Sequence, residues 1–193
     1  MPTNHDYVKQ RITDSVAVKT LTASECTDAI VSAAALVAKC FRNGGKLLLC
    51  GNGGSAADCQ HVATELVGTL TKEIKRPPLP AIALTTDTSF LTAYSNDFDF
   101  DGVFERQVLA LVSPGDILLA ISTSGNSRNV IKAARAAKKT GISVISLTGS
   151  AGQLASAADI AIAIPSDNTQ HIQESHIAVE HIICELIERE MAE

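Results

Sequence analysis

Tryptophan is absent from the 193-residue sequence, and aromatic residues make up only 4% of it. Proteins that bind single-stranded nucleic acid usually stack the bases on aromatic side chains, so this shortage argues against that class of partner. The formal net charge is −5, the pI is about 5.5, and the sequence has no basic run, which argues against binding nucleic acid by charge. We therefore expect no nucleic-acid partner.

The cysteines do not follow the spacing of a zinc site or of a disulfide framework. There are five of them, scattered along the chain and without a CxxC pair. Cys40, Cys50 and Cys184 lie among apolar residues, as buried thiols commonly do. No apolar run approaches the roughly 20 residues of a membrane-spanning helix, and the first residues lack the apolar core of a signal peptide. The sequence therefore predicts a cytoplasmic protein without a membrane partner.

The composition that is present is that of an ordinary globular domain, with 46% hydrophobic and 19% charged residues. Residues 1–43 predict two helices with apolar residues on more than one side, which either pack against a second subunit or cover their own sheet. In residues 44–193, continuous apolar strands alternate with helices, as in a parallel sheet covered on both faces. We predict a single α/β domain over 1–193 with five strands: Lys46–Cys50, Ala81–Leu84, Asp116–Ile121, Ser143–Leu147 and Ile160–Ile164.

A glycine-rich turn, Gly51-Asn52-Gly53-Gly54, follows the first predicted strand. Ser55 stands at the expected start of the next helix, where free backbone N–H groups and the helix dipole attract anions. The same glycines match a weak dinucleotide fingerprint, with Asp87 as a distant candidate for the ribose contact. A tight strand-to-helix turn without any ligand is the alternative.

A second polar turn, 121–127, follows the third predicted strand and gathers hydroxyl groups around a glycine: Ser122, Thr123, Ser124 and Ser127. Phosphate offers several acceptor oxygens, so clustered hydroxyl and N–H donors suit it. The segment after the second strand adds Asn96 and Asp97. Because ligands of an open parallel sheet bind outside the carboxyl ends of its strands, these turns together predict a site for a small phosphorylated molecule.

A possible metal site lies on two of the predicted helices. His61 and Glu65 are four residues apart and share one helix face, while Gln173, His176 and His181 lie on the last helix. Imidazole, carboxylate and amide oxygen suit zinc or a similar cation, although a surface contact would explain His61 and Glu65 as well. Gln173 and His181 are about 12 Å apart along a helix. They share one ion only if their side chains converge, if Gln173 lies in an irregular first turn, or if they come from different subunits.

Four stretches of the sequence resemble the phosphoheptose isomerases, also called sedoheptulose 7-phosphate isomerases, of the SIS-domain superfamily: CGNGGSAADCQHVATE, NDFDF, PGDILLAISTSGNSRNVIKAA and IQESHIAVEH. The resemblance extends from about residue 44 to the end, and the two leading helices fit it. It implies a homotetramer with active sites between subunits and a divalent metal, one zinc per subunit. It also implies that sedoheptulose 7-phosphate is converted to D-glycero-D-manno-heptose 7-phosphate, the first step towards ADP-heptose and the lipopolysaccharide core.

The resemblance also implies roles for individual residues. The phosphate would be held by Ser122, Thr123, Ser124 and Ser127, and the metal by His61, Glu65, Gln173 and His181. The sugar would be lined by Asn52, Gly53, Gly54, Ser55, Asn96 and Asp97, and contacted by Glu65 and Gln173. Our hypothesis for the reaction makes Glu65 the base that takes a carbon-bound proton and His181 the acid and base for the hydroxyl groups.

The sequence departs from the family pattern at Thr69, where members commonly carry an arginine four residues after the glutamate. Lys72, Lys75 and Arg76, in the proline-rich segment that follows, are candidates to replace it. Two other functions stay open: a non-catalytic SIS-domain regulator of the replication-initiator-associating type, and an enzyme for another phosphosugar or a nucleotide. The regulator is disfavoured because the chain keeps all four residues of the implied metal set.

Overall fold

One parallel sheet of five strands forms the centre of the structure, a computed structural model that describes residues 2–192. The strand order is β2-β1-β3-β4-β5, and every neighbouring pair is parallel. This confirms the predicted α/β fold class, and each strand lies within one or two residues of its predicted range. The strands are β1 (Leu47–Cys50), β2 (Ala81–Ala83), β3 (Ile117–Ser122), β4 (Ser143–Thr148) and β5 (Ile160–Ala163).

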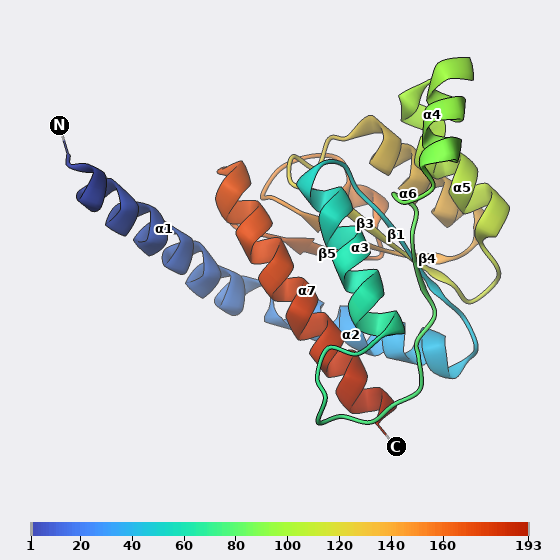
Figure 1. The fold of residues 1–193 in the computed structure, drawn as a ribbon, viewed down its shortest axis with the longest axis horizontal. Coiled ribbons are helices and arrows are strands. Elements are labelled where there is room, and N and C mark those ends of the chain that lie inside the picture. Colours follow the sequence, from blue (N-terminus) through green and yellow to red (C-terminus); the bar gives the residue numbers. More distant parts are fainter. Residues whose placement is uncertain (1, 193) are drawn as a thin grey trace.

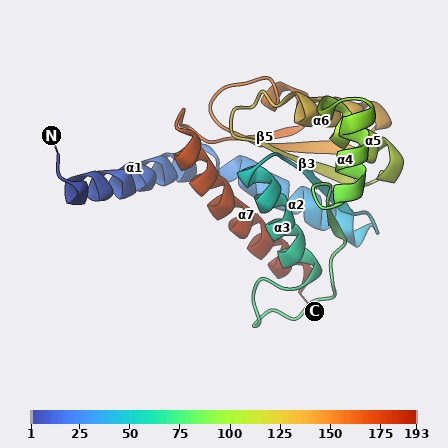
Figure 2. The same ribbon diagram turned by 45° about the horizontal axis from the view of Figure 1, so that its top comes forward.

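Helices cover both faces of this sheet (Figure 1). On one face lie α2 (Thr27–Arg42), α3 (Gly54–Val67) and α7 (Thr169–Met191), and on the other α5 (Val103–Leu111) and α6 (Arg128–Thr140). Figure 2 shows the two layers from the side. The remaining elements are α1 (Asn4–Glu25), α4 (Thr88–Asp97) and two short 3-10 helices, Phe100–Gly102 and Ala155–Ala157.

Alternation along the strands explains why both faces are buried. Successive side chains of a strand point to opposite faces, so Leu47 and Leu49 join the core beneath α2, α3 and α7. Leu48 and Cys50 join the second core, beneath α5 and α6. All four side chains are buried, as expected of the continuous apolar runs of a doubly covered parallel sheet.

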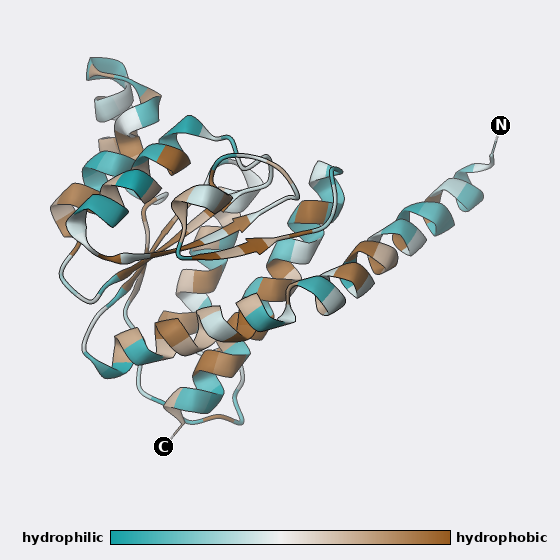
Figure 3. Cartoon of the chain, turned by 180° about the vertical axis from the view of Figure 1, so that it is seen from behind, coloured by the Kyte–Doolittle hydropathy of each residue, from teal (hydrophilic) through white to brown (hydrophobic). Residues whose placement is uncertain are grey.

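The first helix, α1, extends away from the rest of the molecule (Figures 1 and 3). It carries exposed apolar side chains at helical spacing, Tyr7, Val8, Ile12 and Val16, and contacts mainly α7. Within residues 2–192 no single helix is long and apolar enough to cross a membrane. α1 and α2 meet the criteria of length and apolar composition only when taken together, as a pair bent by 69°.

His176 has a place in the core rather than in a polar cluster. Its side chain is fully buried on α7, and its Nε2 lies 3.1 Å from the carbonyl oxygen of Thr148, at the end of β4. The expectation that His176 joins a metal set with His61 is therefore wrong. The reason is helical geometry: five residues separate His176 from His181, which places them about 140° apart around the helix.

Burial lowers the pKa of His176 to about 4, because the low-dielectric core disfavours the charged imidazolium. The unfolded chain protonates this imidazole near its ordinary value of about 6.5, so between these two values the unfolded state binds more protons. The contribution of His176 to stability is therefore present above pH 6.5 and is lost as the pH falls towards 4.

We expect His176→Gln to remove this pH dependence. The free energy of unfolding of the parent should lose about 3 kcal/mol more than that of the variant between pH 7 and pH 4, because 2.5 pH units of differential protonation correspond to that energy. Urea denaturation of both proteins across this range measures the difference. Parallel curves for the two proteins would show that His176 is not held neutral in the core.

Candidate functional site

The serine-rich turn after β3 forms a compact group of hydroxyls at the carboxyl end of the sheet. Ser122 is the last residue of β3, and its Oγ lies 3.0 Å from the Oγ of Ser127 and 3.4 Å from that of Ser124. Ser127 directly precedes α6, so the free N–H groups of that helix begin beside the hydroxyls. The structure therefore brings together three of the four predicted phosphate ligands and places them at a helix start.

The glycine turn after β1 lies beside the serine turn. Gly53 has a φ of +57°, a conformation that side-chain-bearing residues rarely adopt, and α3 begins at the next residue. Asn52 and Asn129 exchange amide hydrogen bonds of 2.8 and 2.9 Å, which join this turn to the start of α6. Our sequence analysis missed Asn129. The sequence clue to Asn129 is an amide side chain in the first turn of the helix that follows the serine turn. The structure shows that this side chain is buried.

An open cavity of about 510 Å³ connects these turns with the first turns of α7. Five predicted residues line it: Asn52, Gly54, Ser55, Thr123 and Gln173. Three lining residues were not predicted: Thr169, Gln170 and Glu174. They belong to the start of α7, whose apposition to the glycine turn is a long-range contact without a local sequence signal.

The histidine and carboxylate pair lies further along the same two helices, since α3 and α7 run side by side (Figure 1). The Nε2 atoms of His61 and His181 are 2.7 Å apart, and the rings meet edge to face. Glu65 follows one turn later on α3, with its Oε1 3.6 Å from Nε2 of His61. The structure therefore brings His61, Glu65 and His181 of one chain close together.

The donor chemistry of this group fits a divalent cation. Two imidazole nitrogens face each other beside a carboxylate, which is the ligand type that zinc takes. Gln173 donates from its Nε2 to Asp58, at 3.0 Å, which leaves the amide oxygen as the atom available to a metal. The side chains do not surround one point as they stand. Within residues 2–192, no three His, Cys, Asp or Glu side chains are arranged so that they could hold one metal ion.

Asn96 and Asp97 are not among the residues that line the cavity of their own chain. They end α4, a helix without a buried residue, and Asn96 Nδ2 donates to Asp97 Oδ1 at 2.9 Å. Asp87, the alternative ribose contact, instead accepts the backbone N–H of Phe90 as the cap of α4. That hydrogen bond gives Asp87 a structural task at the start of the helix.

The three residues that could replace the missing arginine differ in whether their side chains are free to contact a substrate. Arg76 is buried, with 1% of its side chain exposed, and pairs with Glu188 at 2.7 Å. The expectation that Arg76 substitutes for the arginine towards a substrate is wrong, because its guanidinium is fully occupied inside the protein. Thr69 also bonds to Glu188, through its Oγ1. Lys72 and Lys75 are exposed and stay candidates.

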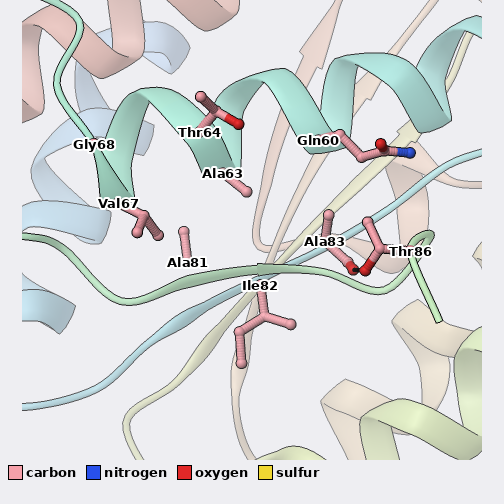
Figure 4. A pocket seen from close by; sticks show the side chains of 9 residues that line it. All are labelled: Gln60, Ala63, Thr64, Val67, Gly68, Ala81, Ile82, Ala83 and Thr86. Carbon is pink, nitrogen blue, oxygen red and sulfur yellow. Dashed lines mark hydrogen bonds between the residues drawn. The ribbon is translucent and has the colours of Figure 1, made fainter.

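A second groove, of about 530 Å³, lies between α3 and the edge strand β2 (Figure 4). Its walls are mostly apolar, from Ala63 and Val67 of α3 and Ala81, Ile82 and Ala83 of β2. The polar groups that reach it are Gln60, Thr64 and Thr86, and none is charged. It therefore has no imidazole, carboxylate or thiol for a metal and mostly apolar walls, and the candidate site is the smaller cavity beside the serine turn.

Comparisons with known proteins identify the family to which the chain belongs. A family model for the SIS domain matches residues 12–149. A protein from Rhodospirillum rubrum named phosphoheptose isomerase is 54% identical over 165 residues, which cover 85% of this chain and 87% of that protein. One of the same name from a Roseiflexus species is 51% identical over 188 residues, covering 97% and 94%.

A solved structure agrees over the whole fold. The phosphoheptose isomerase GmhA from Neisseria gonorrhoeae is 43% identical, with a TM-score of 0.90, and the match covers 97% of this chain and 100% of that one. The family model shows the SIS domain, and the relatives above narrow the match to one family of isomerases. The chain belongs to the SIS-domain superfamily and, within it, to the phosphoheptose isomerases, which are aldose–ketose isomerases.

Proposed function

We propose that this enzyme converts sedoheptulose 7-phosphate to D-glycero-D-manno-heptose 7-phosphate in the cytoplasm, as the first step towards ADP-heptose and the lipopolysaccharide core. The names of its relatives support the substrate class, a phosphorylated seven-carbon sugar. The observation that carries the proposal is the contact of His61 with His181 beside Glu65, on helices that also border the cavity next to the serine turn.

The arrangement suits an elongated sugar phosphate. About 10 Å of helix separates Gly54, at the cavity, from His61 on the same helix. A phosphate held by Ser122, Thr123, Ser124 and Ser127 would leave the rest of the sugar to extend past Asn52, Gly53, Gly54 and Ser55. The first two carbons would then reach the histidine and carboxylate end, where proton transfer takes place.

Two side chains at this end would carry the proton transfers. Glu65 takes a proton from C1 of the ketose and returns it to C2, and His181 moves a proton from the oxygen on C1 to the oxygen on C2. The two transfers balance, so the aldose forms without any external oxidant. The hydroxyl turn holds the phosphate end still, which keeps C1 and C2 within reach of both groups.

We also propose a divalent metal, one zinc per subunit, held by His61, Glu65, Gln173 and His181. The chemistry of these donors supports it, and the side chains of Gln173 and His181, about 12 Å apart along α7, would have to converge on the ion. A bound cation would polarise the carbonyl group and hold the two substrate oxygens in one plane. Glu65 would then share its carboxylate between the cation and the proton transfer.

A homotetramer with active sites between subunits is the third part of the proposal. Its support is the exposed apolar row on α1 and an apolar groove of about 320 Å³ between the α1–α2 bend and α7. α4 gives a second argument, because it has no buried residue and carries exposed Phe98 beyond its end. Association would cover these surfaces and would bring Asn96 and Asp97 to the cavity of another copy.

We expect Glu65→Gln to fold like the parent and to bind sedoheptulose 7-phosphate, yet to turn it over at least about 10²-fold more slowly, the usual cost of losing a general base. Steady-state kinetics, calorimetric titration and thermal unfolding measure the three properties. Glu185→Gln, at an exposed carboxylate of α7 that pairs with Arg189, is the matched control and should keep the parent's rate. Near-native turnover by Glu65→Gln would exclude Glu65 as the base.

Mixing two inactive variants tests whether the sites are shared between subunits. We expect the double variant Asn96→Ala/Asp97→Ala, refolded together with Glu65→Gln, to regain up to about a quarter of the parent's activity, because random assembly then creates some intact sites. A mixture of Glu65→Gln with His61→Asn is the control, since both changes lie in the same chain's helix, and should regain nothing. No recovery in either mixture would contradict shared sites.

A further inference from the structure

A buried ion pair joins the segment after α3 to α7, beyond the histidine contact. Arg76 and Glu188 lie 2.7 Å apart, with 1% and 0% of their side chains exposed. Arg76 belongs to the proline-rich connection between α3 and β2, and Glu188 to the last turn of α7. The pair therefore links the two helices that carry the proposed proton-transfer groups.

The guanidinium of Arg76 closes the end of α3. It donates from Nη2 to the carbonyl oxygen of Glu65 at 2.7 Å, and from Nη1 to that of Leu66 at 2.9 Å. The last carbonyl groups of a helix have no hydrogen-bond donor within the helix. Arg76 is a donor to two of these carbonyl groups in α3. One of the two belongs to the residue that we propose as the base.

The carboxylate of Glu188 holds the chain that leaves α3. It accepts the backbone N–H groups of Leu70 and Thr71, at 2.9 and 3.2 Å, and the hydroxyl groups of Thr69 and Thr71. Burial by itself would raise the pKa of Glu188, but the hydrogen bonds from Leu70, Thr71 and Arg76 outweigh it and lower the pKa. Glu188 is therefore ionised at neutral pH, and its charge meets that of Arg76.

Such a pair is a costly way to obtain stability. The free energy needed to remove two charges from water offsets most of their attraction. Well-packed apolar residues often replace a buried ion pair without loss of stability. What the guanidinium does provide is fixed geometry, because its donors form a rigid planar fork. Here that fork contacts α7 and the end of α3 at the same time.

We propose that Arg76 and Glu188 are positioning residues for the isomerase reaction, acting as a cross-brace that fixes Glu65 on α3 against His181 on α7. Glu188 lies about 10 Å, or two turns, beyond His181 on the same helix. A shift of the last turn of α3 would move Glu65 directly, since Arg76 holds its carbonyl oxygen. This inference rests on the proposed function, because that function assigns the roles of Glu65 and His181.

The test replaces the brace by apolar residues and compares it with a matched ion pair elsewhere. The double variant Arg76→Met/Glu188→Leu removes both charges together. Lys46→Met/Asp116→Leu is the control, because Asp116 is also buried, pairs with Lys46 at 2.6 Å and accepts the backbone N–H groups of Lys46 and Ser113. That pair lies at the amino ends of β1 and β3, opposite the site. Arg76→Lys keeps the charge but loses the fork, and serves if the double variant does not fold.

Kinetics on sedoheptulose 7-phosphate give the first readout. We expect kcat of the brace variants to fall about 10- to 100-fold, the scale of a misplacement of about 1 Å, while KM changes less than about threefold, because the phosphate turn is untouched. The control pair should keep kcat within about twofold of the parent even where its thermal midpoint falls. Unchanged kcat in the brace variants, or an equal loss in the control, would overturn the proposal.

Imidazole ¹H–¹⁵N spectra of the metal-free proteins give a second readout that does not depend on turnover. The signals of His61 and His181 should shift in the brace variants and stay in place in the control, since the brace contacts both α3 and α7 and the Lys46–Asp116 pair contacts neither helix. Unshifted signals in the brace variants would overturn the positioning role. If the parent does not isomerise the sugar, the proposed function fails, and these spectra still decide whether the brace sets the histidine contact.

Discussion

The contact between His61 and His181 depends on α3 and α7 lying side by side over most of their length. Three sets of polar contacts join these helices: Asp58 with Gln173 near the cavity, His61 with His181 in the middle, and the segment after α3 with Glu188 at the far end. Beneath them, Val62 and Leu66 pack with Val179 and Ile183 in one apolar core. The core sets how closely the helices approach, and the polar contacts set which residues meet.

The sheet supplies the other half of the site. Because β1 and β3 are neighbouring parallel strands, the turns that follow them meet at one edge, and the amide pair of Asn52 and Asn129 fixes their separation. The proposed phosphate binding and the proposed proton transfer therefore belong to different structural elements, the edge of the sheet and a pair of helices. They share the start of α3 and of α7, which gives one molecule access to both.

Local patterns explain what the sequence predicted well. Apolar runs and glycine turns depend on neighbours in the chain, so the five strands and the Ser122–Ser127 turn were predicted closely. Long-range packing explains the rest: His176 looked like a ligand by type, but the rotation of α7 turns it towards β4. The pairing of Asn129 with Asn52 spans 77 residues and that of Glu188 with Arg76 spans 112, and no short sequence pattern encodes such pairings.

A zinc titration of the metal-free protein, followed by imidazole ¹H–¹⁵N spectra, tests most directly whether α3 and α7 together form one cation site. We expect the signals of His61 and His181 to change together and to reach their end point at one zinc per chain, while those of His5, His171 and His176 stay in place. A shift in the signals of only one of the two histidines, or of neither, would contradict a cation site shared by α3 and α7.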